Sequence, residues 1–257
     1  MNSVNGSKKY ALLFVGFLGG FLSAMLGIGG GVVFVPALLI MGYEKRALGT
    51  SLAAIVPSAL IGVLAHYIIE GENIQFITAA ITIFGSILGA ELGAQIVKKV
   101  NIKFLKYLIL LFLILAGARY IGIIPGSSHP ITELPHSFLI LLGIIAGMSS
   151  TIFGIGGGVI MVPGFNILFG LSLQEAIPTS LAVILPTTIA GTLFHRFFDN
   201  ISTEAIKYLI PAAFFGAVAG AFVTNSIPSS SLRMIFGGLL IFGVAFSFLR
   251  KKPGINK

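Results

Sequence analysis

Ten hydrophobic segments separated by short polar stretches are the feature that most constrains how this chain can fold. Most of them are long enough to cross a hydrocarbon core of about 30 Å as a helix. Only 9% of the 257 residues are charged, against about 25% in a typical soluble protein, so lipid must cover most of the surface. The sequence therefore predicts an all-α, polytopic transmembrane helical bundle. The expected segments are residues 10–28, 32–42, 48–69, 74–97, 103–124, 137–155, 159–170, 177–197, 204–225 and 231–250.

Composition excludes several classes of function. The net charge of +8 would suggest nucleic-acid binding in a soluble protein. Here the charges lie between hydrophobic runs and at the chain ends, so they are topology signals and no nucleic-acid partner is expected. The absence of cysteine excludes disulfides and thiolate metal sites. The four histidines lack metal-ligand spacing, and we expect no metal and no cofactor.

The chain contains two copies of one unit. The run GFLGGFLSAMLGIGGGVVFVP, which begins at Gly16, matches GIIAGMSSTIFGIGGGVIMVP, which begins at Gly143. We therefore predict an N-terminal repeat, an outer loop and a C-terminal repeat, at residues 1–124, 125–136 and 137–257. Other matched pairs are Thr50 and Ser51 with Thr179 and Ser180, Pro57 with Pro186, and His66 with His195.

The placement of basic residues predicts that the two repeats are inverted in the membrane. With the N-terminus in the cytoplasm, all lysines and arginines except Arg119 and Arg233 lie on the cytoplasmic side, as the positive-inside rule requires. The first repeat then begins inside and ends outside, and the second does the reverse. Both termini are expected in the cytoplasm.

Inverted repeats favour passage of a solute over catalysis. Secondary transporters use a pseudo-twofold axis in the membrane plane to form inward-open and outward-open states. An anion channel can also use this arrangement and stays an alternative. An intramembrane enzyme is a weaker alternative, because it needs a catalytic pair inside the bundle and Asp199 is the only aspartate in the chain. We expect a non-enzyme without catalytic residues.

The second segment of each repeat is short and follows a glycine cluster. Counting from the charged loops places both clusters near mid-membrane, and the sequence leaves open whether the short segments cross fully or re-enter as broken helices. Helices that begin at Gly31 and Gly158 would offer N-terminal amides to an anion. The predicted substrate-binding residues are Gly29, Gly30, Gly31, Thr50, Ser51, Pro57, Ser58, Gly156, Gly157, Gly158, Thr179, Ser180, Pro186, Thr187 and Thr188.

Each of these assignments has a structural alternative. The glycine clusters could serve helix packing, and the Thr-Ser pairs could cap the helices that follow them. Glycines that we assign to helix packing are Gly85, Gly89, Gly93, Gly216 and Gly220. Gating or proton coupling is predicted for three titratable residues. His66 and His195 could instead anchor helices at the membrane interface, and Glu91, the carboxylate within a hydrophobic stretch, could reach the cytoplasmic interface.

At the G-I-G-G-G-x-x-x-V-P and T-S-L-A blocks the chain resembles the sulfite exporter TauE/SafE family of permeases. The resemblance covers roughly residues 11–249 and depends on the doubled motif at matched spacing. It implies a multi-pass permease of the bacterial or archaeal cytoplasmic (inner) membrane that carries sulfite, a sulfonate or a related organosulfur anion, often with proton coupling. The implied partners are this small anion, the lipid bilayer and, in a homo-oligomer, further copies of the chain.

Overall fold

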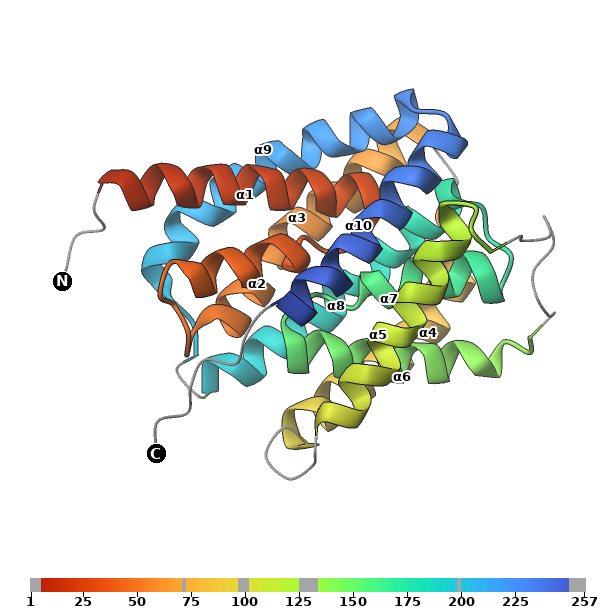
Figure 1. Cartoon of the computed structure of the whole chain (residues 1–257), viewed down its shortest axis with the longest axis horizontal. Helices are drawn as coiled ribbons and strands as arrows, with labels where there is room; N and C mark the ends of the chain where they lie inside the picture. The colour runs from red at the N-terminus through yellow and green to blue at the C-terminus, as the bar shows by residue number, and fades with distance from the viewer. Residues whose placement is uncertain (1–5, 71–72, 97–101, 125–133, 198–199, 250–257) are drawn as a thin grey trace.

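A computed structural model describes residues 6–70, 73–96, 102–124, 134–197 and 200–249 of the chain. Across these residues the chain is all-helical, and five of its helices are long and apolar enough to cross a membrane. This confirms the predicted fold class. In chain order (Figure 1) the elements are α1 (Gly6–Leu26), α2 (Gly31–Ile40), α3 (Ala47–Glu70), α4 (Phe76–Ile96), α5 (Ile102–Tyr120), α6 (Ser137–Phe153), α7 (Gly158–Pro163), the π-helix η1 (Gly164–Leu168), α8 (Leu173–Phe197), α9 (Thr203–Ser226) and α10 (Ser229–Leu249).

Most of the loop predicted between the repeats, residues 125–133, lies outside the described residues. The domain boundaries at 124 and 137 therefore stay predictions. The helix order in the two parts of the chain is nevertheless parallel: α1 to α5 precede this loop, and α6 to α10 follow it, with η1 extending α7.

The first helix of each repeat packs against the fourth helix of the other repeat. α1 lies along α9: a Cβ added at Gly16 would meet the Leu209 carbonyl oxygen at 2.7 Å, and one at Gly20 would meet the backbone of Ala213. Both residue numbers rise together, so the two helices run in parallel. Glycine permits this close approach because it has no side chain to separate the backbones.

The counterpart pair, α4 and α6, packs in the same way. A Cβ added at Gly85 would meet the backbone of Ile140, and one at Gly89 would meet the backbone of Ile144. The predicted packing role of the glycines at spacing four is confirmed here. It is confirmed equally in α9, where a Cβ at Gly216 would collide with the backbone of α1.

Counterpart helices of the two repeats pair with each other in opposite directions. In the α3–α8 pair, Gly62 lies against Leu181 whereas Gly191 lies against Leu52, so one residue number falls as the other rises. The α5–α10 pair is also antiparallel and carries an edge-to-face ring contact between Tyr120 and Phe236, at 5.4 Å between ring centroids. The mirrored pairings are those expected from a twofold relation between the halves, whereas inversion in the membrane stays a prediction.

A capping box explains why α8 begins earlier than the predicted residue 177. The Glu175 amide donates to the Ser172 hydroxyl at 3.2 Å, and the Ser172 amide donates to the Glu175 carboxylate at 2.8 Å. These reciprocal bonds satisfy amide groups that a helix start leaves without intrahelical acceptors. The helix therefore begins at Leu173 and continues through Pro178 and Pro186.

Candidate substrate site

Both short helices begin at the glycines that the sequence predicts. α2 begins at Gly31 and α7 begins at Gly158, and the residue before each has a left-handed backbone, with φ of 72° at Gly30 and 82° at Gly157. L-amino acids adopt this conformation only at a cost in energy, whereas glycine, which has no Cβ, adopts it readily. The chain can therefore reverse sharply and start a new helix inside the bundle.

The two glycine turns, residues 27–31 and 154–158, contact each other at the centre of the bundle. A Cβ added at Gly29 would lie 3.5 Å from the Gly156 Cα, and the reverse is also true. One added at Gly31 would fall on the Ile155 backbone, and one at Gly158 would fall on the Gly27 carbonyl. The described turns are thus packed together rather than separated by the open pocket that an anion between them would need.

The serines at matched positions of the two repeats bind the turn of the opposite half. Ser51 Oγ donates to the Gly154 carbonyl oxygen at 2.7 Å, and Ser180 Oγ donates to the Gly27 carbonyl oxygen at 2.9 Å. All four groups are buried, and Gly154 is the C-cap residue that follows the last residue of α6. The two bonds tie each half of the chain to the helix end of the other.

The neighbouring threonines accept hydrogen bonds from the opposite half as well. The Ser202 amide donates to Thr50 Oγ1 at 2.8 Å, and the Gln75 amide donates to Thr179 Oγ1 at 3.0 Å. The alternative that these residues cap their own helices is wrong. α3 begins at Ala47, and α8 begins at Leu173, six residues before Thr179. The hydroxyls therefore lie within helices and stabilise neighbouring elements instead.

The two central prolines lie at one level of the bundle. Pro57 lies midway between Leu52 and Gly62 of α3. These two residues lie against Gly191 and Leu181 of α8, and Pro186 lies midway between that second pair. Beside them, Ser58 Oγ donates to the Ile55 carbonyl at 2.9 Å, and Thr188 Oγ1 donates to the Ile184 carbonyl at 2.8 Å. Thr187 Oγ1 likewise donates to the Val183 carbonyl at 2.7 Å, and it also lies 2.7 Å from Ser86 Oγ of α4.

The histidines hold the last turns of α1 and α6. His66 Nε2 lies 2.9 Å from the Ala24 carbonyl oxygen, and His195 Nε2 lies 3.2 Å from the Thr151 carbonyl oxygen. A carbonyl oxygen only accepts, so Nε2 carries the hydrogen in both rings. His66 is only 1% exposed; this burial does not fit an anchor in the lipid interface. Gating and proton coupling stay predictions for both residues.

Glu91 lies apart from the turns. Its side chain is exposed on the outer face of α4, where Gln95 Nε2 approaches its carboxylate at 3.5 Å. The corresponding position of the second half is the exposed Phe222. Proton coupling at Glu91 stays a prediction, and the side chain does not face the two glycine turns.

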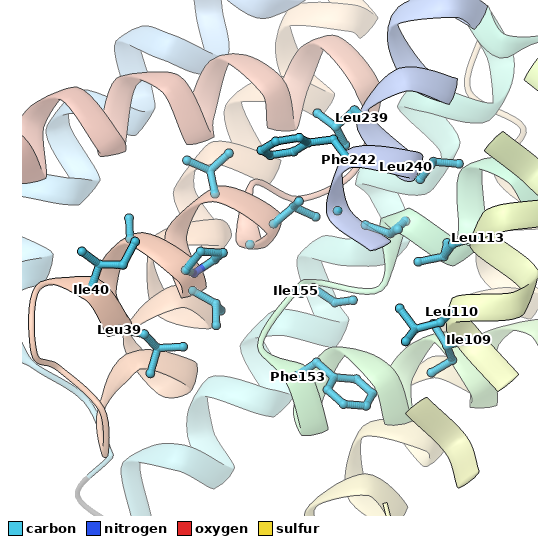
Figure 2. A pocket seen from close by; sticks show the side chains of 18 of the residues that line it. Leu39, Ile40, Ile109, Leu110, Leu113, Phe153, Ile155, Leu239, Leu240 and Phe242 are labelled. Atoms are coloured by element: carbon cyan, nitrogen blue, oxygen red, sulfur yellow. The ribbon is translucent and has the colours of Figure 1, made fainter. Parts of the chain in front are cut away.

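A cavity reaches the turns from one side, as Figure 2 shows. It has a volume of about 910 Å³ and lies between α2 on one side and α5 and α10 on the other. Gly31, Val32 and Ile155 are among the residues that line it, and Glu44 is the one charged side chain among the described lining residues. The sequence analysis missed this cavity, because its apolar lining is indistinguishable by composition from a lipid-facing surface.

The helices and the paired glycine breaks define a polytopic helical membrane protein with two matched halves. A family model described as sulfite exporter TauE/SafE matches residues 12–248. The chain belongs to this family, and the resemblance seen in its motifs is confirmed.

Curated relatives are named as membrane transporters. The probable membrane transporter protein YunE of Bacillus subtilis is 29% identical over 257 residues, covering 90% of this chain and 93% of the relative. The probable membrane transporter protein YdhB of the same organism is 30% identical, covering 90% and 99%. The probable membrane transporter protein MJ0441 of Methanocaldococcus jannaschii is 29% identical, covering 89% and 91%. No solved structure matches the chain.

Proposed function

We propose that this chain is a secondary permease that moves a small anion across the cytoplasmic (inner) membrane by alternating access, and that it is not an enzyme. The observation that carries the proposal is the pair of short helices that begin at Gly31 and Gly158 and whose preceding glycine turns contact each other. Helix N-termini favour anions, because their first amides lack intrahelical acceptors and carry a partial positive charge.

The mirrored packing of the halves supports alternating access. α1 pairs with α9 as α6 pairs with α4, and the counterpart pairs α3–α8 and α5–α10 run antiparallel. Two halves related in this way can exchange near-equivalent conformations in which one turn or the other opens. The proposal includes inverted repeats with both termini in the cytoplasm, as the distribution of lysine and arginine predicts.

In this proposal the cavity beside α2 is the route by which the anion reaches the glycine turns. Its lining includes Gly31, the first residue of α2, and most of its walls are apolar side chains of α2, α5 and α10. Such walls favour an anion that carries a carbon group. Within the chemistry indicated by the family description, a sulfonate therefore fits this route better than bare sulfite.

Proton coupling is assigned in this proposal to the histidines, since both of their rings lie at the junction between helix end and glycine turn. Protonation of a ring that holds the end of α1 or α6 would alter the hydrogen bonds at that junction. Replacing His66 or His195 by glutamine should then reduce uptake driven by a proton gradient while preserving exchange of substrate.

Reconstitution in liposomes tests the function directly. We expect labelled methanesulfonate or sulfite to accumulate in proteoliposomes preloaded with the same unlabelled anion, because counterflow requires a site that alternates between the two faces. Liposomes preloaded with gluconate serve as the control. Anion current in planar bilayers without counterflow would assign the channel alternative, and the absence of either would reject transport of these anions.

A further inference from the structure

Two buried serine hydroxyls, one in each repeat, have no hydrogen-bond partner. Ser23 lies in the last turn of α1 and Ser150 lies in the last turn of α6, and both are 0% exposed. They occupy matched positions, four residues before the first glycine of each turn. A buried polar group without a partner is rare in native proteins and indicates a ligand or water that completes it.

Helix periodicity places both hydroxyls beside the helix face that contacts the following short helix. A Cβ at Gly30 would lie 2.5 Å from the Gly19 carbonyl oxygen, and one at Gly157 would lie 2.8 Å from the Ala146 carbonyl oxygen. Residues four apart share a helix face, so Ser23 follows Gly19 on this face, and Ser150 follows Ala146. Helix side chains lean towards the N-terminus, which brings each hydroxyl towards the start of the short helix.

The surrounding carbonyl oxygens are already occupied by donors. At the first turn, the Ser23 carbonyl accepts from the Gly27 amide at 2.9 Å, and the Met25 carbonyl accepts from Thr224 Oγ1 at 2.9 Å. The carbonyls of Ala24 and Gly27 accept from His66 and Ser180. A cation needs several oxygen ligands, whereas the groups left over here are hydroxyls that can donate. The chemistry therefore favours an anion.

We infer that Ser23 and Ser150 donate hydrogen bonds to the transported anion at the N-terminal ends of the two short helices. This inference rests on the proposed function and adds two substrate contacts to it. The two hydroxyls stay unpaired while the turns are packed together, and each gains its acceptor when an anion enters at its turn.

The test compares Ser23→Ala, Ser150→Ala and the double variant with Ser149→Ala. Ser149 is a matched control, because it is buried beside Ser150 but already donates to the Ile145 carbonyl at 2.7 Å. The readout is binding of methanesulfonate and of sulfite to purified full-length protein, measured by thermal shift and by uptake into liposomes. We expect each single variant to weaken apparent affinity about tenfold, and the control to bind like the wild type.

Stability without anion distinguishes a binding role from a structural one. Removing an unpaired hydroxyl leaves nothing unsatisfied, so the ligand-free variants should unfold at or above the wild-type temperature. A lower unfolding temperature without anion would overturn the inference, because it would reveal a structural partner such as a fixed water.

The remaining outcomes separate this inference from the proposed function. Wild-type affinity in both single variants would overturn the serine contacts and leave the anion carrier intact. Serine-dependent stabilisation by sodium, with unchanged anion affinity, would reassign the hydroxyls to a cation and overturn the inference as well. If the wild type itself neither binds nor transports these anions, the proposed function fails, and the serine contacts fail with it.

Discussion

The α1–α3–α9 side and the α4–α6–α8 side of the molecule have the same packing but different polarity. Each consists of two parallel helices joined through glycines and a third helix that carries the central proline. Among the described residues, the second side has nine buried hydroxyl residues, and only four of their counterparts are hydroxyl residues. The buried hydroxyl residues are Thr82, Ser86, Ser149, Ser150, Thr151, Thr179, Ser180, Thr187 and Thr188, and the counterparts are Ala213, Ala217, Leu22, Ser23, Ala24, Thr50, Ser51, Ser58 and Ala59.

The two copies of the repeat therefore agree in their glycines at backbone contacts but differ in the polarity of their buried side chains. Most of the additional hydroxyls bond within their own helix, as Thr82 does to the Thr78 carbonyl at 2.7 Å. A serine or threonine that bonds one turn back adds little to helix stability and takes little from it. Glycines at backbone contacts have no such freedom, because any side chain there must displace a neighbouring helix.

The strongest test of the shared backbone requirement is Gly31→Ala alongside Gly158→Ala. Each new Cβ would fall on the backbone of the opposite turn, which cannot move aside as a flexible side chain can. We expect both variants to lose about 3 kcal/mol or more, seen as a large fall in unfolding temperature in detergent. Gly238→Ala is the control, since nothing lies within 4 Å of its added Cβ. If only one of the two substitutions lowered the unfolding temperature, the two halves would not share the same backbone requirement.

A smaller effect should follow removal of the serine bonds between halves. Ser51→Ala and Ser180→Ala each leave a buried carbonyl oxygen without its donor. We expect each to cost about 1 kcal/mol, and the two costs to agree because the bonds are mirrored. Unfolding temperatures of the single variants measure this, with Ser149→Ala as the comparison for loss of a hydroxyl that bonds within its own helix. A cost confined to one serine would show that only one turn needs this support.

The polarity difference itself is tested by a double-mutant cycle on Ser86→Ala and Thr187→Val. These hydroxyls bond across α4 and α8 at 2.7 Å, whereas their counterparts, Ala217 and Ser58, cannot form such a bond. We expect a coupling energy of about 0.6 kcal/mol, the average for hydrogen bonds between membrane helices. A coupling energy near zero would show that this extra hydrogen bond does not stabilise the second side. A much larger value would make the bond a main contributor to stability.

The smallest effect is expected for Glu91→Gln. The side chain is exposed and its counterpart is the exposed Phe222, so neither copy of the repeat buries this position. We expect an unchanged unfolding temperature. The dependence of anion uptake on pH tests the predicted proton-coupling role: a flattened pH profile would support it, and an unchanged profile would remove it.

Much of the architecture could be read from local patterns. The hydrophobic segments, the helix starts at Gly31 and Gly158, and the packing role of Gly85 and Gly89 were all predicted, because each depends on helix length or on the properties of glycine. The hydrogen-bond acceptors of Ser51 and Ser180 were not predicted. Their acceptors are more than a hundred residues away in the chain, and a hydroxyl pattern gives no indication of its distant partner.

The amino-acid sequence alone predicts a doubled set of membrane helices broken at matched glycines, and it identifies the transporter family. Length, hydrophobicity and the conformational freedom of glycine act locally, so they need no knowledge of the fold. Three features appear only in the folded chain: each first helix pairs with the other half, the turns pack on one another, and a cavity opens beside α2. In lipid, an apolar side chain gains little by choosing protein over hydrocarbon, so helix partners are selected by close backbone fit and by buried hydrogen bonds, which exist only once the helices have assembled.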